Sequence, residues 1–413
     1  MSPRVVVAVN GPGELMGWAR PLVRALYALA PDARVTIVFV PCPYATGREA
    51  AAAQALFPRA MVVAPKQYAR FLMGRAVEGM ERGPGALQYL GGDLYHAKTI
   101  AKRIGLTAMT YKFSRRNFAH SFVRFFAVDD ANAQALRAAG APPDAVRVVG
   151  NLVADAVLDS LASGPHPPGE GDSICVFPGS RPPELRALLP FFLDAALRAA
   201  RAHAGLRVSV SISPFTADEQ IVASLRVPDP DFGGVCGELV DGGRALQVGA
   251  TRVAIDRSGT YEALARAALV IATPGTKCVE AAVLGRPMLV VVPFNRLDEA
   301  VIPGPGGYLH RVPLIGKPLK RLLAHAFERR FKYMAQPNID AGRELVPELR
   351  GFLTPQDVAE RAGAVLDDTS GRRAMGEELV RLYARDPGAS HRMAHEVLAV
   401  ATLAGAPATG AAS

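Results

Sequence analysis

The chain has few of the features that mark secreted, metal-binding or membrane-spanning proteins. Its 413 residues include only four cysteines, which are scattered and form no C-x-x-C pair, so the sequence indicates neither a disulfide framework nor a zinc site. No apolar run approaches the roughly 18 residues that a membrane-spanning helix needs. The run Val5–Val9 begins without the charged and then apolar pattern of a secretory signal. We therefore expect a globular, cytoplasmic protein with reduced cysteines and no metal.

Acidic charge is scarce in the first part of the chain. Residues 1–150 contain 19 Lys and Arg against 9 Asp and Glu, whereas residues 151–413 contain 28 against 29. The net charge of +9 therefore comes from the N-terminal part. A basic surface attracts nucleic acids, anionic membranes or anionic substrates, and composition alone does not distinguish among these partners.

Two segments of this basic part, 66–75 and 111–126, mix cations with aromatic and methionine side chains. In one interpretation the aromatic side chains belong to the core and the cations are solvated. In the other, the cations meet anionic head groups while apolar side chains enter the acyl boundary of a membrane. Each segment alone favours the core, but both together with the uneven charge favour an anionic membrane surface. Interleaved Arg and Phe could also stack on bases, but no RNA-binding signature accompanies them, so we expect no nucleic acid.

Hydrophobic periodicity predicts alternating strands and helices in both halves of the chain. In the first half, the strands of an open parallel sheet are expected at 4–9, 35–40, 87–90, 108–111 and 125–128. A stretch rich in Pro and Gly, 163–171, then separates a second alternating region that begins at Ile174. The predicted fold is α/β, with two Rossmann-like domains whose parallel sheets face each other across a cleft.

These patterns also set the expected domain limits. We divide the chain into a domain at 1–155, a linker at 156–170, a second domain at 171–350, C-terminal helices at 351–400 and a tail at 401–413. The tail consists mainly of small residues, which bury little apolar surface, so we expect it to be disordered.

The stretch 267–294 predicts a strand, a loop, a helix and a second strand, so that the loop lies at the carboxyl end of the first strand. A helix that starts there offers unpaired N–H groups and positive dipole to a phosphate. Gly275 and Thr276 form such a cradle, and Lys277 adds a full charge. Glu280 follows about one turn later, where a carboxylate can accept hydrogen bonds from ribose hydroxyls. The stretch indicates a nucleotide-diphosphate site, although a plain turn followed by a solvated glutamate fits it as well.

A second loop of this kind follows the strand expected at 173–177. It contains Ser180 and Arg181, a hydroxyl and a fork of donors that suit a phosphate, and it also opens a helix. Two phosphate-binding loops in one domain favour the nucleotide interpretation of both.

Several motifs resemble those of lipid-A-disaccharide synthases. Residues 337–349, PNIDAGRELVPEL, look like the PN-x-x-AGRE-x-VPEL signature of that family, and residues 178–184 resemble its PGSR-x-x-E loop. Residues 275–282 are similar to part of its SGTATLEAAL loop, and residues 149–155 to its VGHPLVD turn. The match is colinear from about residue 5 to 370. The resemblance implies a GT-B fold, an inverting and metal-independent transfer of a sugar from a UDP donor, and a lipid-bearing sugar phosphate as acceptor.

The resemblance also implies roles for individual residues on the donor side. Four of them would contact the diphosphate, namely Ser180, Arg181, Gly275 and Thr276. Glu280 would contact the ribose. Asn338, Arg343 and Glu344 would line the cleft near the donor and the leaving group, with Arg343 counted among the catalytic residues. For Arg343, an ion pair with a glutamate of its own helix is the alternative.

An inverting transfer needs a base for the acceptor hydroxyl and positive charge for the departing UDP. Asp93 ends a strand of the acceptor half and aligns with an aspartate considered catalytic in the family, so it is the predicted base. Glu14 is the second candidate. Aspartate is also a frequent N-cap of helices, and this interpretation of Asp93 is equally open.

The acceptor half departs from the family pattern. The GEASGD loop of the family is here GPGELMG at residues 11–17, and its SPSVWAWR segment becomes TYKFSRR at residues 110–116. We predict a UDP-sugar-dependent hexosyltransferase that moves an acylated glucosamine to a lipid sugar phosphate, as in lipid A synthesis, at the inner face of the cytoplasmic membrane. The family exchanges C-terminal segments between subunits, which implies either a homodimer or helices that return to the first domain.

Three other functions stay open. The chain could be a related transferase with a different lipid acceptor, or a sugar-nucleotide epimerase of the same fold, similar to UDP-N-acetylglucosamine 2-epimerase, which needs no second substrate. It could also be a protein without catalytic activity that binds RNA or anionic lipid through its first half.

Overall fold

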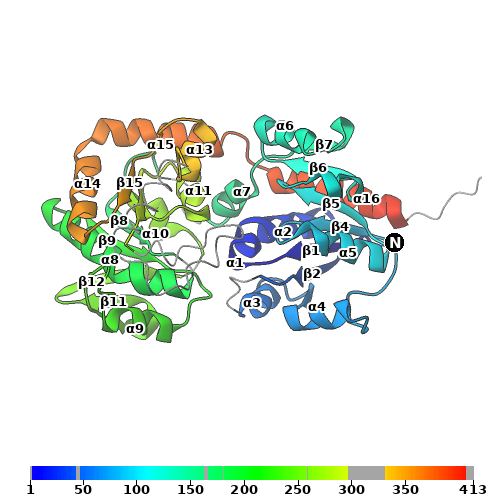
Figure 1. Ribbon diagram of the computed structural model, residues 1–413, viewed down its shortest axis with the longest axis horizontal. Coiled ribbons are helices and arrows are strands. Elements are labelled where there is room, and N and C mark those ends of the chain that lie inside the picture. The colour runs from blue at the N-terminus through cyan, green and yellow to red at the C-terminus, as the bar shows by residue number, and fades with distance from the viewer. Residues whose placement is uncertain are drawn as a thin grey trace, which may run out of the picture. The chain divides into compact units, whose positions relative to one another are not determined.

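The structure, a computed structural model, describes residues 2–42, 47–161, 166–179, 181–257, 259–295 and 331–405. It consists of two compact units, one formed by Met1–Asp159 with Asp386–Ser413 and the other by Ser160–Arg385. Each unit is built around one sheet that carries helices on both faces (Figure 1). The first change of unit, at Asp159, falls inside the linker expected at 156–170.

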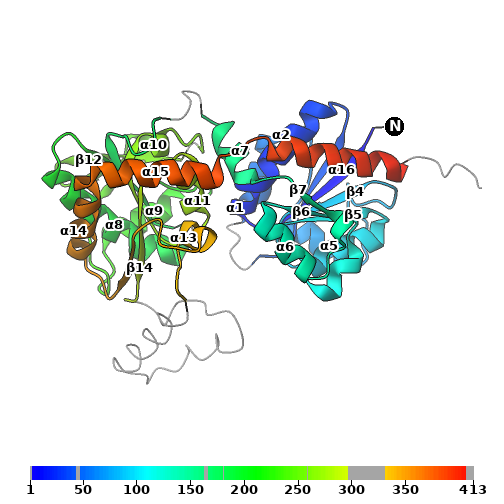
Figure 2. The same cartoon turned by 90° about the horizontal axis from the view of Figure 1, so that it is seen from above.

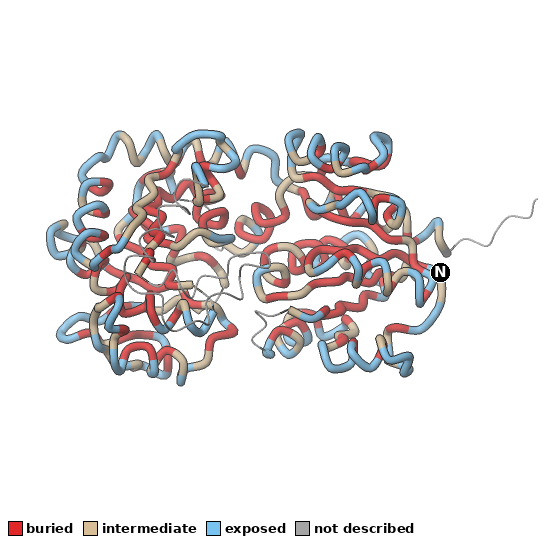
Figure 3. Tube along the Cα trace, in the orientation of Figure 1, coloured by how far each residue is buried: buried red, intermediate tan, exposed pale blue. Residues whose placement is uncertain are grey.

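Unit 1 contains a sheet of seven parallel strands in the order β3-β2-β1-β4-β5-β6-β7. The strands are β1 (Arg4–Val9), β2 (Arg34–Phe39), β3 (Met61–Val63), β4 (Ala86–Tyr89), β5 (Thr107–Tyr111), β6 (Arg124–Ala127) and β7 (Val146–Val148). Val5 to Val9 of β1 are all fully buried, because helices cover both faces of a parallel sheet (Figure 3). This explains why the strand is a continuous apolar run without alternation.

Helices pack on the two faces of this sheet. They are α1 (Pro12–Glu14), the π-helix η1 (Leu15–Ala19), α2 (Arg20–Leu29), α3 (Glu49–Leu56), α4 (Pro65–Leu72), α5 (Leu94–Ile104), α6 (Asp130–Ala138), α7 (Leu152–Leu158), α16 (Ala389–Gly405) and the 3-10 helices η2 (Arg116–Ser121) and η3 (Pro143–Ala145). Helices α4 and α5 contact the strands on one side, and their apolar residues join Val6 and Ala8 in one core cluster. Helix α16 packs against β1, β4, β5 and α2.

The C-terminal helix α16 is fixed to unit 1 by one buried carboxylate. Asp155 of α7 accepts hydrogen bonds from the backbone N–H of Gly388 at 2.7 Å and of Ser390 at 2.6 Å, and from the Ser390 hydroxyl at 2.6 Å. Figure 2 shows α16, in red, lying along α2. These bonds satisfy N–H groups at the start of α16 that have no acceptor within the helix.

Unit 2 contains a sheet of eight strands in the order β10-β11-β12-β9-β8-β13-β14-β15. The strands are β8 (Ser173–Phe177), β9 (Arg207–Ser211), β10 (Glu238–Val240), β11 (Ala245–Val248), β12 (Thr251–Asp256), β13 (Ala267–Ala272), β14 (Met288–Pro293) and β15 (Glu348–Gly351). The pairings of β10 with β11 and of β11 with β12 are antiparallel, whereas all the others are parallel. The sheet is therefore mostly parallel, as expected, with an antiparallel edge that the sequence did not indicate.

Helices of unit 2 also cover both faces. Those in the described part of the chain are α8 (Pro182–Ala202), α9 (Asp218–Arg226), the 3-10 helix η4 (Asp241–Gly243), α10 (Glu262–Ala265), α11 (Thr276–Val283), α13 (Gln336–Ala341), α14 (Pro355–Asp367) and α15 (Thr369–Tyr383). Helices α8 and α14 contact each other and share one core cluster with β8, β9, β13 and β14. Helix α11 contacts β13 and β14 and packs against α13 and α15.

Arg286, in the turn between α11 and β14, is a fully buried cation of unit 2. Its guanidinium donates to five backbone carbonyl groups, those of His166, Pro167, Glu170, Ala265 and Leu284. Burial lowers the pKa of Arg286 to about 10, so the side chain remains protonated near neutral pH. The residue thus ties the segment that enters unit 2 to the β13-α11-β14 element.

The C-terminal segment differs from its expected limits. Residues 351–400 are expected to cross back to the first domain or to a partner subunit. In the structure, α14 and α15 belong to unit 2 and α16 belongs to unit 1. Residues 401–405 were assigned to a disordered tail, but they belong to α16, which continues to Gly405. Residues 406–413 lie outside the described part of the chain.

Candidate functional site

Two loops of unit 2 leave the sheet from neighbouring positions. Strands β8 and β13 are parallel neighbours in which Phe177 pairs with Ala272, and both strands end at this pair. The loop that follows β8 leads into α8, and the loop that follows β13 leads into α11. The structure therefore brings the two predicted phosphate loops to one edge of the sheet, with two helix N-termini beside them. Ser180 of the first loop lies outside the described residues.

The two loops use glycine for different reasons. Gly179 has a φ of +93°, and a Cβ atom there would lie 2.7 Å from the Glu184 carboxylate, so a side chain at this position meets both strain and a clash. A Cβ atom on Gly275 would meet nothing within 4 Å, which leaves open space beside the start of α11. The backbone at Gly275 is thus open to a ligand.

In the loop after β8, Arg181 is exposed and forms an ion pair with Glu184 at 2.8 Å.

Lys277 and Glu280 form the polar centre of this edge. The Lys277 Nζ atom lies 2.6 Å from Glu280 Oε2, and the Glu280 side chain is only 7% exposed, against 39% for Lys277. The amine also lies over two aromatic rings, 5.3 Å from the centre of Phe177 and 5.6 Å from that of Tyr261. Glu280 is therefore not the solvated helix residue of the simpler interpretation.

The charges around Lys277 favour its protonated form. Burial lowers the pKa of the amine, but Glu280 and Tyr261 outweigh that effect and leave the pKa above its usual value. Tyr261 itself has a φ of +63°, in the left-handed region that a bulky residue rarely occupies. Backbone strain of this kind recurs at binding sites, and here it holds an aromatic ring beside the lysine.

Asn338 of the PN-x-x-AGRE motif is buried and takes part in local hydrogen bonds. Its amide nitrogen donates to the carbonyl of Val346 and to Glu348, both at 2.8 Å, and its oxygen accepts from the N–H of Leu345 at 2.7 Å and of Val346. The contacts of Asn338 explain the motif as a structural turn.

Thr276, at the first position of α11, is exposed.

Arg343 and Glu344 are directed to the C-terminal helices of unit 2. Arg343 forms an ion pair with Glu378 of α15, rather than with a glutamate of its own segment. Glu344 is exposed and lines a cavity of about 270 Å³ together with residues of α14 and α15. The structure thus gives both residues partners other than the two loops at the ends of β8 and β13.

Unit 1 carries a second polar cluster, at the carboxyl ends of its neighbouring strands β1 and β4. Glu14 follows β1 and is half-buried, and burial raises the pKa of its carboxyl group, partly offset by its own backbone N–H. A Cβ atom on Gly91 would lie 2.7 Å from Glu14 Cγ and 2.5 Å from Asn10 Oδ1. Only glycine at position 91 leaves room for the two side chains, so the β4 loop is shaped around Glu14.

Asp93 belongs to the same loop but performs a structural task. Its carboxylate accepts a hydrogen bond from the Tyr95 N–H at 2.9 Å and so caps α5, while the side chain is exposed. This is the capping interpretation that the sequence left open. The cap engages one carboxylate oxygen, Oδ1, and a base needs only one oxygen.

Three polar residues beside the clusters were not among the predicted site residues. Asn10 Oδ1 is buried without a hydrogen-bond partner in the described part of the chain. Tyr89 donates to the carbonyl of Gly92, and burial raises the pKa of its phenol. Tyr261 lies beside Lys277 as described above. Asn10 directly follows the first strand, a position that could have suggested it, whereas nothing in the sequence indicates the contacts of the two tyrosines.

The two basic segments of unit 1 are partly core and partly surface. Tyr68, Phe71 and Tyr111 are buried, as the simpler interpretation expects, whereas Met73 is 68% and Phe113 is 48% exposed. Tyr95, on α5, is also exposed. Among the described residues, no helix combines the length and the hydropathy that a membrane crossing requires.

Among the described residues there is also no group of three or more His, Cys, Asp or Glu side chains arranged to hold a metal ion. None of the four cysteines forms a disulfide with a described residue, and Cys175 and Cys278 are buried.

The fold of the chain belongs to the GT-B class. The chain matches the structure of UDP-GlcNAc 2-epimerase from Neisseria meningitidis bound to UDP-GlcNAc with a TM-score of 0.56 and 12% identity, over 96% of this chain and 99% of that one. It matches the wall teichoic acid polymerase TagF with a TM-score of 0.53 and 11% identity, over 97% and 90%. At such identities the likeness shows the fold alone, and it confirms the predicted fold class.

In sequence, the chain is similar to lipid-A-disaccharide synthases. It is 32% identical over 239 residues to that of Anaeromyxobacter dehalogenans strain 2CP-1, which covers 56% of this chain and 50% of the relative. It is 29% identical over 232 residues to that of Myxococcus xanthus strain DK1622, covering 55% and 49%. The chain thus matches about half the length of these curated relatives, and no family model matches it. The resemblance inferred from the motifs is confirmed over that part.

Proposed function

We propose that the protein is an inverting glycosyltransferase that moves a sugar from a UDP donor to a lipid sugar phosphate. The carrying observation is the edge of unit 2 where the strands β8 and β13 end side by side. There Lys277 pairs with Glu280, and its amine lies over the rings of two aromatic residues. The named activity of the sequence relatives supports transfer. Structures of the same fold are named with UDP or UDP-GlcNAc bound, which supports a nucleotide sugar as donor.

On the donor side, the diphosphate meets the N–H groups at the start of α11, together with Ser180, Arg181, Gly275 and Thr276. Helix α8 begins with Pro182 and Pro183, which have no N–H, so it contributes mainly its dipole. The backbone donors at the start of α11 are in place before the reaction, so they stabilise the charge that develops on departing UDP. Glu280 accepts hydrogen bonds from the ribose. The positive charge that the leaving group needs comes from Lys277 and the two helix N-termini, and this chemistry requires no metal ion.

On the acceptor side, we assign the base to Glu14 in preference to Asp93. A carboxylate in a desolvated site with a raised pKa is a better proton acceptor than an exposed one that already caps a helix. The base removes the proton of the acceptor hydroxyl, the oxygen attacks the anomeric carbon from the face opposite to UDP, and UDP departs with inversion. Asn338, Arg343 and Glu344 then act indirectly, by shaping unit 2.

The acceptor is proposed to be a lipid-linked sugar phosphate held at an anionic membrane surface. Unit 1 contains the basic residues 1–150, and it exposes Met73, Tyr95 and Phe113 among them. Apolar side chains surrounded by cations suit the inner face of the cytoplasmic membrane. An acylated glucosamine is the leading transferred sugar, and self-association through the C-terminal segment is part of the same proposal.

The assay for this proposal is the release of UDP. The protein is incubated with UDP-2,3-diacylglucosamine and fractionated lipid extract, and UDP is measured with and without the lipid. We expect release that depends on the lipid acceptor. An isomerised donor in the absence of lipid would identify an epimerase instead, as the structural likeness to UDP-GlcNAc 2-epimerase allows. Neither release nor isomerisation, with lipid or RNA bound, would identify a protein without catalytic activity.

The donor site predicts opposite effects of one substitution on two ligands. In the free protein the Lys277 amine is paired with the Glu280 carboxylate. A ribose without phosphate must displace this amine before it can bind Glu280. UDP also brings phosphate groups, with which the displaced amine can pair. Lys277→Met should therefore weaken UDP binding roughly 10- to 100-fold, since a hydrogen bond to a charged group contributes about 1.5–3 kcal/mol. Uridine, which lacks phosphate, should bind as well as before or more tightly. Calorimetric titration of both ligands measures this difference.

Two further variants control this titration. Lys277→Arg keeps the charge and should retain most of the affinity for UDP. Lys98→Met removes a cation from α5 of unit 1 and should leave the affinity for both ligands unchanged. If Lys277→Met lowered the affinity for UDP and uridine equally, the amine would have no specific role toward the phosphates.

A further inference from the structure

Unit 2 contains a cavity of about 490 Å³ at the edge of the sheet opposite to the candidate donor loops. It lies where β8, β9 and β12 begin, at Ser173, Arg207 and Thr251, whereas the donor loops follow the strand ends. A volume of this size is in the range of small-molecule sites, about 300–1,000 Å³. The proposed transfer reaction makes no use of this cavity.

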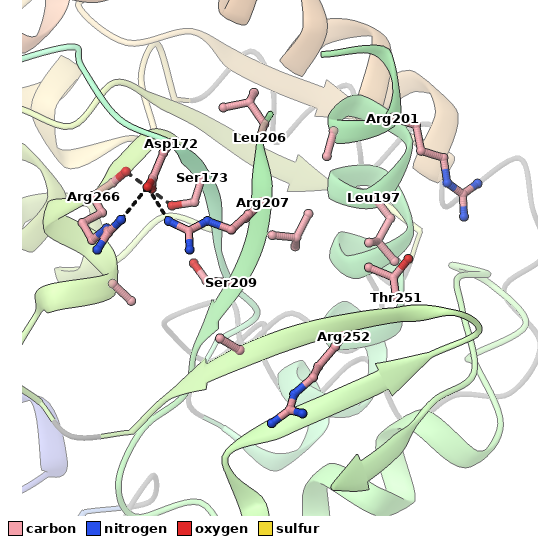
Figure 4. A pocket seen from close by; sticks show the side chains of 14 residues that line it. Asp172, Ser173, Leu197, Arg201, Leu206, Arg207, Ser209, Thr251, Arg252 and Arg266 are labelled. Atoms are coloured by element: carbon pink, nitrogen blue, oxygen red, sulfur yellow. Dashed lines mark hydrogen bonds and ion pairs between the residues drawn. The ribbon is translucent and has the colours of Figure 1, made fainter. Parts of the chain in front are cut away.

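The polar wall of the cavity is strongly cationic. Four arginines line it against a single aspartate, Asp172. Figure 4 shows Arg207 and Arg266 converging on this carboxylate, while Arg201 points away from the pair. Both guanidinium groups donate to Asp172 Oδ2, that of Arg266 at 2.6 Å. The hydrogen bond from Arg266 is the main cause that holds the pKa of Asp172 below its usual value.

Asp172 therefore fixes the orientation of two guanidinium groups but accepts hydrogen bonds from only some of their N–H donors. An arginine has five N–H donors, and Asp172 is the one side chain among the described residues that accepts a hydrogen bond from Arg207 or Arg266. Their side chains are 65% and 51% exposed, so a ligand can reach them. Arg252 of β12 adds a third cation to the wall, paired with Asp241. Preoriented forks of this kind suit bidentate contact with a phosphate.

Two buried polar atoms at this site form no hydrogen bond of good geometry with the described residues. Ser209 of β9 is 7% exposed, and its hydroxyl forms no hydrogen bond of good geometry with the described residues, although it lies beside the Cys175 thiol. Asp172 Oδ1 is buried and unpaired as well.

The remaining wall is apolar and includes Leu197, Leu206 and Val208. Inorganic phosphate alone would leave most of the volume empty and this wall uncovered. We propose that the cavity binds an organic phosphate, with the phosphate on Arg207 and Arg266 and an apolar body on these side chains. The site lies in unit 2 but is separate from the donor site, and the proposal does not depend on the proposed glycosyl transfer.

The test is calorimetric titration of the full chain with three probes. Hexyl phosphate represents a soluble organic phosphate, dihexanoyl phosphatidic acid below its micellar concentration represents a lipid head group, and hexanol lacks the phosphate. We expect saturable binding of at least one phosphate probe and none of hexanol, and the tighter probe identifies the source of the ligand. Saturating UDP should leave this binding unchanged.

The variants are designed to keep the fold intact. The double substitution Arg207→Gln and Arg266→Gln should lower the affinity for the phosphate probe at least tenfold, because both charged contacts are lost. Arg381→Gln, on exposed α15, is the matched control and should bind as the natural protein does. Unchanged thermal unfolding of the double variant would show that unit 2 is folded. Absence of saturable binding in the natural chain, equal affinity in the double variant, or competition by UDP would each overturn the proposal.

Discussion

Replacement of Glu14 by glutamine is expected to lower the rate of glycosyl transfer by about 10²- to 10⁴-fold, the usual contribution of a positioned base. Glutamine keeps the shape that fits between Gly11 and Gly91 but cannot take up a proton. Binding of UDP should stay unchanged, because the proposed donor residues belong to unit 2. Measurement of kcat for UDP release together with the Kd of UDP separates the two effects.

The pH dependence gives an independent readout of the same residue. Burial raises the pKa of Glu14, and a base must be deprotonated to act. Activity should therefore fall, as the pH is lowered, at a higher pH than an ordinary glutamate would produce. In Glu14→Gln this acid limb should disappear from the residual activity.

Asp93→Asn is the matched control, because asparagine caps a helix as well as aspartate does. The hydrogen bond to the Tyr95 N–H can then persist while the carboxylate is lost. We expect a much smaller loss of activity than in Glu14→Gln. The reverse order, with Asp93→Asn nearly inactive and Glu14→Gln active, would assign the base to Asp93.

Replacement of Arg286 by methionine is expected to destabilise unit 2 by about 2–6 kcal/mol, since each buried acceptor left unsatisfied costs about 1–3 kcal/mol. Two of its hydrogen bonds, to the carbonyls of Leu284 and Ala265, are wholly buried. Three others hold the segment at residues 166–170. Methionine fills similar space but donates nothing to these carbonyls. Hydrogen exchange of the α11 and β14 amides under native conditions measures the loss.

Two substitutions bracket this expectation. Arg286→Lys keeps a charge but lacks the planar guanidinium, so the stability of unit 2 in this variant should lie between those of the natural protein and of Arg286→Met. Arg381→Met, on the exposed side of α15, should change stability by no more than about 0.5 kcal/mol. Equal protection of α11 in the natural protein and in Arg286→Met would mean that the carbonyl groups find other donors.

Much of the fold could be predicted because its signals are local. The runs at Val5–Val9 and Ala267–Ala272 are apolar on both faces, which is typical of strands in a covered parallel sheet. Glycines at the ends of such strands marked the loops at Gly179 and Gly275. The antiparallel edge formed by β10 and β11 gave no comparable signal, because its strands are short and follow a turn-rich stretch.

The candidate site was predictable only in part. Gly275, Thr276 and Glu280 share one loop and one helix, so their proximity follows from the sequence. The ion pair between Lys277 and Glu280 depends on side-chain rotamers. The ion pair between Arg343 and Glu378 depends on α15, a helix distant in the chain. The roles assigned to these residues in catalysis and binding stay predictions.

The sequence by itself determined the class of fold and the positions of its turns, since hydrophobic period and glycine placement act over a few residues. Only the tertiary structure decided which polar groups meet, because burial and charge neighbours depend on segments far apart in the chain. It made Glu14 a desolvated carboxylate and Asp93 a helix cap, and it gathered arginines around Asp172 at an edge where no motif lies.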